Sequence, residues 1–167
     1  INLEANIQVK ALDTPGHTFA HLCFLLSEDG IAKAVFTGDT LFNAGAGNCH
    51  HGGHPNELYM TFASQLAKLP GNTQIYPGHD YIVNNLQFTL DREPTNEAAS
   101  KLLDKIESQD PVNALVTSIE QEKGVNTFFR LNNPEVIENL RVSFPDMPAN
   151  PDEKTVFVAL RELRNKW

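Results

Sequence analysis

The stretch FTGDTLF, residues 36–42, sets Asp39 directly behind a short run of strand-forming residues. That run, residues 33–37, favours a β-strand, and Gly38 after it favours a turn. A strand end of this kind holds one side chain at the end of a sheet with little freedom, as a metal ligand or catalytic group requires. Asp39 is therefore a candidate functional residue.

Two other stretches repeat this arrangement. TPGHT, residues 14–18, follows a predicted strand and contributes His17, and YPGHDY, residues 76–81, follows another and contributes His79. One histidine in a turn would indicate little by itself. Two histidines and one aspartate at three strand ends predict a metal site, because His and Asp are usual ligands of hydrolytic zinc.

The first half of the chain consists mainly of strands. They are expected at residues 7–12, 20–26, 33–37 and 74–76. A loop rich in glycine and histidine spans residues 38–55, and loops of this length in a compact domain usually carry function. The helix after it shows apolar residues at helical spacing before a Pro-Gly stop: Leu58, Phe62, Leu66 and Leu69.

The second half of the chain is predominantly helical. Helices are expected at residues 81–90, 97–107, 112–122, 134–142 and 152–166. No strong strand pattern occurs there, and the composition changes near residue 80. We therefore predict an α/β (α+β) fold in two parts, residues 1–79 with the sheet and residues 80–167 with helices.

The composition excludes several classes of protein. The 167 residues are 41% hydrophobic, enough for a core, and their formal net charge of −8 argues against a nucleic-acid binder. No apolar stretch is long enough for a membrane span, and no signal peptide begins the chain. The two cysteines do not form a disulfide framework. We expect a cytoplasmic protein with neither nucleic-acid nor membrane partners.

Taken together, TPGHT, FTGDTLFNAGAG, YPGHDYIVNNLQF and EPTN resemble the glyoxalase II group of the metallo-β-lactamase superfamily, over nearly the whole chain. This resemblance implies the second half of an αββα sandwich in residues 1–79, followed by a helical substrate-binding domain. It also implies that His17 ligates one metal, that Asp39 bridges two, and that His79 ligates the second. The metals would be zinc, with iron or manganese as alternatives.

The same resemblance implies an activity and a substrate. Hydroxyacylglutathione hydrolases cleave the thioester S-D-lactoylglutathione to glutathione and D-lactate, and Asp39 would also orient the nucleophile. Tyr81 matches a tyrosine that binds the glutathione moiety, and Arg130 matches an arginine suited to its glycyl carboxylate. Asn48 and His50 stand where the family has a lysine and a tyrosine.

One family motif is absent from residues 1–167. The family carries an upstream T-H-x-H-x-D-H motif that supplies two ligands to each metal, and this pattern does not occur in the chain. One metal would keep His17 and Asp39, and the other would keep Asp39 and His79, whereas a catalytic zinc takes three protein ligands. We expect the chain to be part of a longer enzyme, and by itself to bind metal weakly and to be inactive.

Two other functions are open at this point. One is a persulfide dioxygenase-like enzyme with a single iron, which has similar TPGHT and GD signatures. The other is a binding or regulatory module without catalysis. Whatever the function, strands that lack the neighbours of the missing half would leave sheet edges and apolar surface open, which predicts self-association of the chain.

Overall fold

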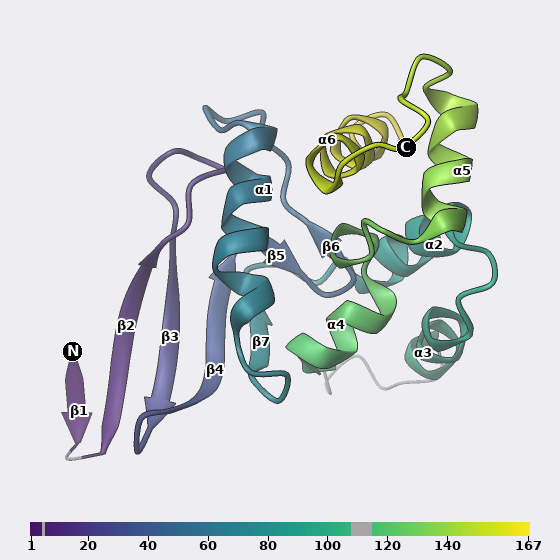
Figure 1. The fold of residues 1–167 in the computed structure, drawn as a ribbon. Coiled ribbons are helices and arrows are strands. Elements are labelled where there is room, and N and C mark those ends of the chain that lie inside the picture. Colours follow the sequence, from purple (N-terminus) through teal and green to yellow (C-terminus); the bar gives the residue numbers. More distant parts are fainter. Residues whose placement is uncertain (5, 108–114) are drawn as a thin grey trace.

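The computed structural model describes residues 1–4, 6–107 and 115–167. Its strands, in chain order, are β1 (Asn2–Glu4), β2 (Ile7–Asp13), β3 (Leu22–Glu28), β4 (Ile31–Gly38), β5 (Leu41–Phe42), β6 (Gly45–Ala46), β7 (Gln74–Pro77) and β8 (Thr117–Ser118). Its helices are α1 (Pro55–Ser64), α2 (Ile82–Arg92), α3 (Glu97–Glu107), α4 (Ile119–Val125), α5 (Pro134–Ser143) and α6 (Glu153–Arg164), with 3₁₀ turns η1 (Leu66–Lys68) and η2 (Thr127–Phe129). The first half is thus rich in strands and the second half is helical, as predicted (Figure 1).

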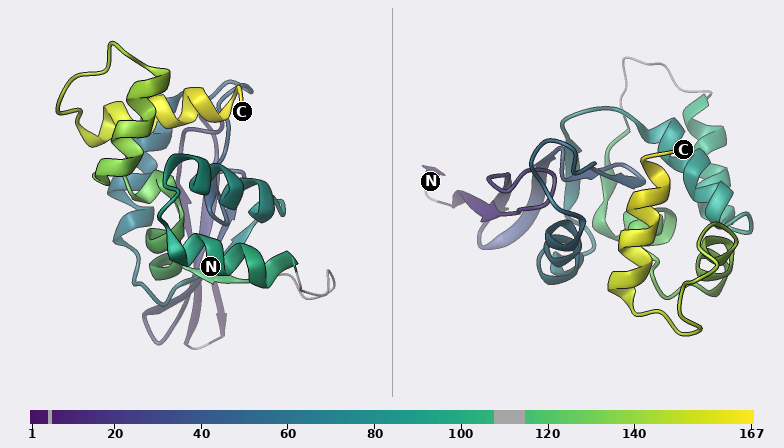
Figure 2. Two further views of the ribbon diagram at one scale, coloured as in Figure 1. Left: turned by 90° about the vertical axis from the view of Figure 1, so that its right-hand side faces the viewer. Right: turned by 90° about the horizontal axis from the view of Figure 1, so that it is seen from above.

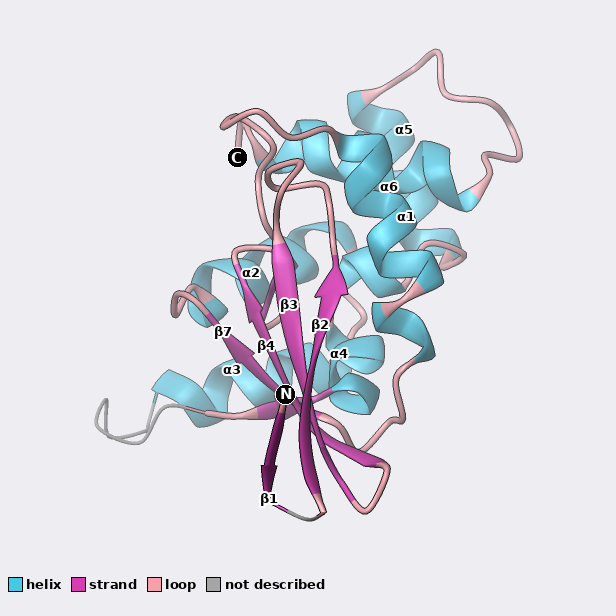
Figure 3. Ribbon diagram, turned by 90° about the vertical axis from the view of Figure 1, so that its left-hand side faces the viewer, coloured by secondary structure: helices cyan, strands magenta, loops and turns pink. Residues whose placement is uncertain are grey.

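The main sheet has the strand order β1-β2-β3-β4-β7-β8. Neighbouring strands are antiparallel except β4 and β7, which are parallel and connected through α1. Strands β2, β4 and β7 therefore point the same way, with β3 reversed between β2 and β4 (Figure 3). As a result, the segments that follow these three strands start from the same end of the sheet.

Helix α1 covers one face of the sheet. It begins at Pro55, whose fixed φ suits the first turn of a helix. Leu58 and Phe62 stand one helical turn apart and are buried in one core with Val35 of β4 and Ile75 of β7. The apolar residues whose helical spacing was noted in the sequence thus form the stripe that packs the helix against the sheet.

The core continues across residue 80. The cluster that contains Val35 and Phe62 also contains Phe88, Phe128 and Phe157, whose rings lie next to Phe62 or to one another. Strand β8 extends the sheet at β7, and the C-terminal helices gather beyond that side, opposite the N-terminus (Figures 1 and 2). The division into domains at residues 79 and 80 stays a prediction.

The helix predicted at residues 112–122 begins later than expected. Residues 112–114 lie outside the described residues, Thr117–Ser118 form β8, and α4 starts at Ile119. The Ser118 side chain accepts from the Gln121 N–H while the Gln121 side chain accepts from the Ser118 N–H, a capping box that starts the helix there.

Two further elements were not predicted. The expected loop at residues 38–55 contains a hairpin of β5 and β6, and strand β1 pairs with β2 at the edge of the sheet. Both involve strands of only two or three residues, which are too short to show an alternating pattern.

The face of the sheet opposite α1 carries exposed aromatic side chains. Phe24, Phe36 and Tyr76 are neighbours in register across β3, β4 and β7, and they are 43%, 46% and 37% exposed. The rings of Phe36 and Tyr76 stack with their centroids 5.4 Å apart. We call these three residues the aromatic ladder, an apolar surface that is only partly covered in the described part of the chain.

Candidate active site

Three strand ends bring the predicted metal ligands together. His17 lies in the connection after β2, Asp39 follows β4 directly, and His79 follows β7 after one glycine. Asp39 stands between the two histidines: its Oδ2 is 3.7 Å from Nε2 of His17 and its Oδ1 is 3.4 Å from Nε2 of His79. Each histidine therefore faces a different oxygen of one carboxylate.

A backbone carbonyl orients the His17 ring. Its Nδ1 lies 2.7 Å from the carbonyl oxygen of Asn48. Because a carbonyl only accepts, Nδ1 carries the hydrogen and donates, which leaves the lone pair on Nε2 directed toward Asp39. Metal-binding histidines are typically fixed in this way by a hydrogen bond on the other ring nitrogen.

His17, Asp39 and His79 could supply part of the ligands for two metal ions, one on each side of Asp39. A histidine nitrogen and a carboxylate oxygen face each other on both sides of Asp39, and both are common ligands of divalent metals. Across residues 1–4, 6–107 and 115–167, no group of three His, Cys, Asp or Glu side chains is arranged to hold a metal. Each predicted metal position would therefore have two protein ligands among the described residues, one fewer than a catalytic zinc takes.

The other nearby histidines have different partners. Nδ1 of His21 lies within hydrogen-bonding distance of the hydroxyls of Thr14 and Thr40, at 3.1 and 2.9 Å, and burial lowers the pKa of His21. His54 caps α1, where its Nδ1 accepts a hydrogen bond from the backbone of Asn56. These contacts give His21 and His54 roles in the structure of the turns.

The backbone around Asp39 requires a glycine at position 47. A Cβ built on Gly47 would lie 1.8 Å from the carbonyl oxygen of Asp39, much closer than atoms can approach. The Gly47 N–H donates to the Thr40 carbonyl at 3.0 Å. The hairpin of β5 and β6 thus begins just after Asp39, and the chain returns at Gly47 to pack against the backbone of Asp39.

A pocket of about 240 Å³ opens next to His79. Three residues predicted to bind substrate, Asn48, His50 and Tyr81, line it together. The Tyr81 ring stacks on the His79 ring with centroids 5.4 Å apart and meets the Phe42 ring edge-on at 5.1 Å. Tyr81 therefore connects the pocket to His79, although none of the three predicted metal ligands lines it. The remaining lining residues are Phe42, Ala46, Asn85, Arg161, Arg164 and Asn165.

Two arginines of α6 line this pocket, and neither was predicted. Arg161 is 4% exposed, and its Nη1 donates to the carbonyls of Ala46 and Gly47 at 2.6 and 3.1 Å. Burial lowers the pKa of Arg161 to about 10, so the guanidinium is still charged at neutral pH. Among the described residues, neither Arg161 nor Arg164 forms an ion pair with an acidic side chain.

Arg130, the arginine selected from the sequence, lies elsewhere. Its guanidinium binds the Glu93 carboxylate through two hydrogen bonds, Nε to Oε2 at 2.6 Å and Nη2 to Oε1 at 2.5 Å. Glu93 is buried, and hydrogen bonding to it raises the pKa of Arg130. Arg130 is not among the residues that line the pocket next to His79.

A signal for the missed arginines was present in the sequence. Arg161 and Arg164 are three residues apart and therefore share one face of a helix, and that face also carries the buried residues Phe157 and Leu160. An arginine within an apolar stripe is uncommon unless it has a partner.

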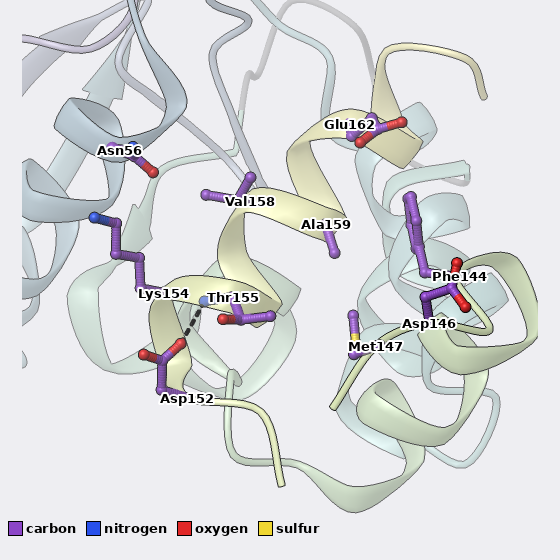
Figure 4. Close-up of a pocket in the computed structure, with 10 residues that line it drawn as sticks. All are labelled: Asn56, Phe144, Asp146, Met147, Asp152, Lys154, Thr155, Val158, Ala159 and Glu162. Carbon is purple, nitrogen blue, oxygen red and sulfur yellow. Dashed lines mark hydrogen bonds between the residues drawn. The ribbon is translucent and has the colours of Figure 1, made fainter. Parts of the chain in front are cut away.

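A larger cavity, of about 460 Å³, lies on another side of α6. Figure 4 shows it between α6 and the segment with Phe144 and Met147, with Lys154 directed toward Asn56. None of the residues predicted to bind metal or substrate lines it. Its size therefore does not identify it as the active site.

Comparison with known proteins identifies similar sequences. Residues 80–167 match the family model described as hydroxyacylglutathione hydrolase C-terminus. The chain is 62% identical over 161 residues to hydroxyacylglutathione hydrolase of Nitrosococcus oceani, covering 96% of this chain and 60% of that protein. It is 56% identical over 167 residues to the enzyme of that name from Polaromonas sp., covering 100% of this chain and 63% of that protein. The chain thus spans about three fifths of the length of these relatives.

Two solved structures also match nearly the whole of this chain and about half or less of their own length. ETHE1 from Myxococcus xanthus matches with a TM-score of 0.53 and 26% identity, covering 98% of this chain and 56% of that one. A metallo-β-lactamase from Staphylococcus aureus matches with a TM-score of 0.52 and 23% identity, covering 95% of this chain and 40% of that one. The second likeness concerns the fold alone.

Proposed function

Because the chain belongs to the hydroxyacylglutathione hydrolase family, we propose that it provides the C-terminal part of a metal-dependent thioester hydrolase acting on S-D-lactoylglutathione. The predicted fold class, α/β (α+β) with the second half of a metallo-β-lactamase sandwich followed by helices, is confirmed. The reaction forms a C–O bond from water and breaks the C–S bond. It releases D-lactate and glutathione.

The chain's own residues support this chemistry at the end of the sheet. A divalent metal bound there would lower the pKa of a coordinated water and polarise the thioester carbonyl. His17, Asp39 and His79 would hold the metals, and the Asp39 carboxylate would also orient the attacking oxygen. The leaving thiolate needs no strong acid, since thiols have a pKa of about 8.5. Zinc is our proposal for the metal, with iron or manganese as alternatives.

The observation that carries the substrate proposal is the buried charge of Arg161. A guanidinium that is 4% exposed and whose hydrogen-bond partners in the described part of the chain are all neutral is expensive to keep charged. A carboxylate in the pocket would compensate that charge with a forked pair of hydrogen bonds. The glycyl carboxylate of glutathione is such a group, and Arg164 stands three residues further along α6 to assist.

The predicted substrate residues take complementary places in this proposal. Tyr81 would contact the peptide of glutathione next to His79, and Asn48 and His50, which line the same pocket, would contact it as well. Arg130 could contribute only by releasing the buried Glu93 carboxylate. We therefore propose Arg161 for the glycyl carboxylate.

A chimera tests the function. In it, this chain replaces the matching part of the Nitrosococcus oceani hydrolase, to which it is 62% identical. We expect the chimera to hydrolyse S-D-lactoylglutathione, while the isolated chain does not, because each metal position in the chain has two ligands. Thiol release and bound metal are measured for both. Turnover of the isolated chain with tightly bound zinc would contradict the proposal, and oxygen consumption with bound iron would favour a dioxygenase.

We also propose that copies of the isolated chain associate through the open sheet. The aromatic ladder provides an apolar surface for this contact. Sedimentation velocity is expected to show oligomers that Phe36→Lys shifts toward monomer, whereas Val142→Lys, at an 80% exposed site on α5, does not. A sharp monomer peak together with no binding of an apolar dye would contradict the proposal.

Cytoplasmic location stays a proposal as well. In the part of the chain that the structure describes, no helix has the length and apolar character to cross a membrane. One relative, from Arabidopsis thaliana, is named a cytoplasmic hydroxyacylglutathione hydrolase and is 35% identical to this chain over 169 residues.

A further inference from the structure

The hairpin of β5 and β6 is held in place by side chains from the helical half. The Ala46 and Gly47 carbonyls accept from Arg161, and the Asn126 amide of α4's C-cap donates to the Gly45 carbonyl at 3.1 Å. The Asn85 amide of α2 donates to the Asn43 carbonyl at 2.9 Å. The wall of the pocket next to Asp39 is therefore supported mainly by contacts distant in sequence.

Glu122 of α4 lies at the centre of this support. Its side chain is fully buried, and its Oε2 accepts from the Ala44 backbone N–H at 2.9 Å and from the Asn126 amide at 2.8 Å. Its Oε1 accepts from the Thr117 hydroxyl at 2.7 Å. One carboxylate thus joins the tip of the hairpin to both β8 and α4.

The neighbouring hydrogen bonds fix the direction of these contacts. The Thr117 hydroxyl accepts from the Asn43 amide at 2.7 Å, so its own hydrogen is available to Glu122. All the groups that meet the Glu122 carboxyl are donors, which suits an ionised carboxylate. Burial raises the pKa of Glu122 to about 7 and the three donors act in the opposite direction, so the group is largely ionised at pH 8.

The hydrogen bond from the Ala44 N–H to Glu122 is made at a residue with an unusual backbone conformation. Ala44 has a φ of +55°, in the left-handed region that residues other than glycine seldom occupy. An acceptor fixed at its N–H selects this conformation over extended ones. The direction in which the Ala46 and Gly47 carbonyls leave the turn depends on it, and these carbonyls hold the Arg161 guanidinium at the pocket.

We propose that Glu122 is a positioning residue for the substrate pocket: by fixing the turn at Ala44, it places the carbonyls that orient Arg161 toward an anionic ligand. The ligand in this statement rests on the proposed function. The link from Glu122 through the hairpin to Arg161 rests on the hydrogen bonds alone, and the two parts can therefore fail separately.

The test compares three variants of the 167-residue chain at pH 8. Glu122→Leu removes the acceptor, Glu122→Gln keeps a carbonyl oxygen of the same reach, and Glu120→Gln is an exposed control on the same helix. The measurements are amide hydrogen exchange at Ala44, with Val35 and Leu86 as core references, the NMR signal of the Arg161 Nε–H, and the affinity for glutathione.

Loss of the buried acceptor is expected to speed exchange at Ala44 at least tenfold in Glu122→Leu, with Val35 and Leu86 unchanged. The Arg161 Nε–H signal should shift or broaden, and glutathione should bind about tenfold more weakly. Glu122→Gln should restore most of each change, and Glu120→Gln should match the unmodified chain.

Three results would overturn the inference. The first is an unchanged Ala44 exchange rate and Arg161 signal in Glu122→Leu. The second is equal acceleration of exchange at Val35 and Leu86, which would mean that Glu122 serves only global stability. The third is a disturbed Arg161 signal without any loss of affinity in a chain that binds glutathione. If the unmodified chain binds no glutathione, the proposal that glutathione is the ligand is wrong. The exchange rate at Ala44 and the Arg161 signal then still decide whether Glu122 positions Arg161.

Discussion

Asp39→Ala is expected to lower kcat/KM for S-D-lactoylglutathione by about 10³-fold or more in the chimera. The substitution removes the carboxylate that faces both His17 and His79, at 3.7 and 3.4 Å. It therefore takes a ligand from both metal positions and removes the group that orients the nucleophile. Bound metal per chain should fall together with the rate.

The fold should tolerate this change. The Asp39 side chain is 34% exposed and does not belong to the apolar core, so the melting temperature should remain close to that of the unmodified chimera. Asp104→Ala, at an exposed position on α3, is the matched control and should retain full activity. Retention of more than about a tenth of the activity by Asp39→Ala would contradict the bridging role.

Arg161→Met is expected to weaken glutathione binding by about 100-fold, because a charge-assisted pair of hydrogen bonds is lost. Its long apolar stem should still fill the space next to Phe128, over whose ring the guanidinium lies. In the chimera, KM should rise more than kcat falls. Calorimetric titration with glutathione and steady-state kinetics measure the two effects.

The comparison with Arg130→Met separates the two candidate arginines. Arg130 neutralises the buried Glu93, so its removal should lower the melting temperature by several degrees without a matching loss of affinity. A large loss of glutathione affinity in Arg130→Met and none in Arg161→Met would show that Arg130 binds the glycyl carboxylate, as the sequence predicted. It would also exclude the pocket lined by Arg161 as the glutathione site.

The parts predicted well from the sequence are those with strong local signals. Strands β2, β3, β4 and β7 have runs of β-forming residues, and His17, Asp39 and His79 follow three of them in tight turns. Because β2, β4 and β7 run in the same direction, the residues that follow them meet at one end of the sheet. Asn48, His50 and Tyr81 were selected through the family resemblance, and they line one pocket.

The parts that sequence reasoning missed depend on distant contacts. Strand β8 exists because Thr117 and Ser118 pair with β7, and two residues carry no periodicity. Arg161 reaches the hairpin across 115 positions of the chain, so no local pattern shows which carbonyls it binds. Arg130 was chosen by motif, and the pairing that occupies it, with the buried Glu93, appears only in three dimensions.

The long sequence separation between the hairpin and α6 has a consequence for synthesis on the ribosome. The sheet, with His17, Asp39 and His79, is complete in its main strands once β7 has emerged, but Ala46 and Gly47 gain their donor only after α6 has been made. A nascent chain that stops short of α6 can therefore pair its strands while its pocket lacks a wall. If Arg161 binds the substrate as proposed, the pocket becomes able to do so last, when the final helix docks.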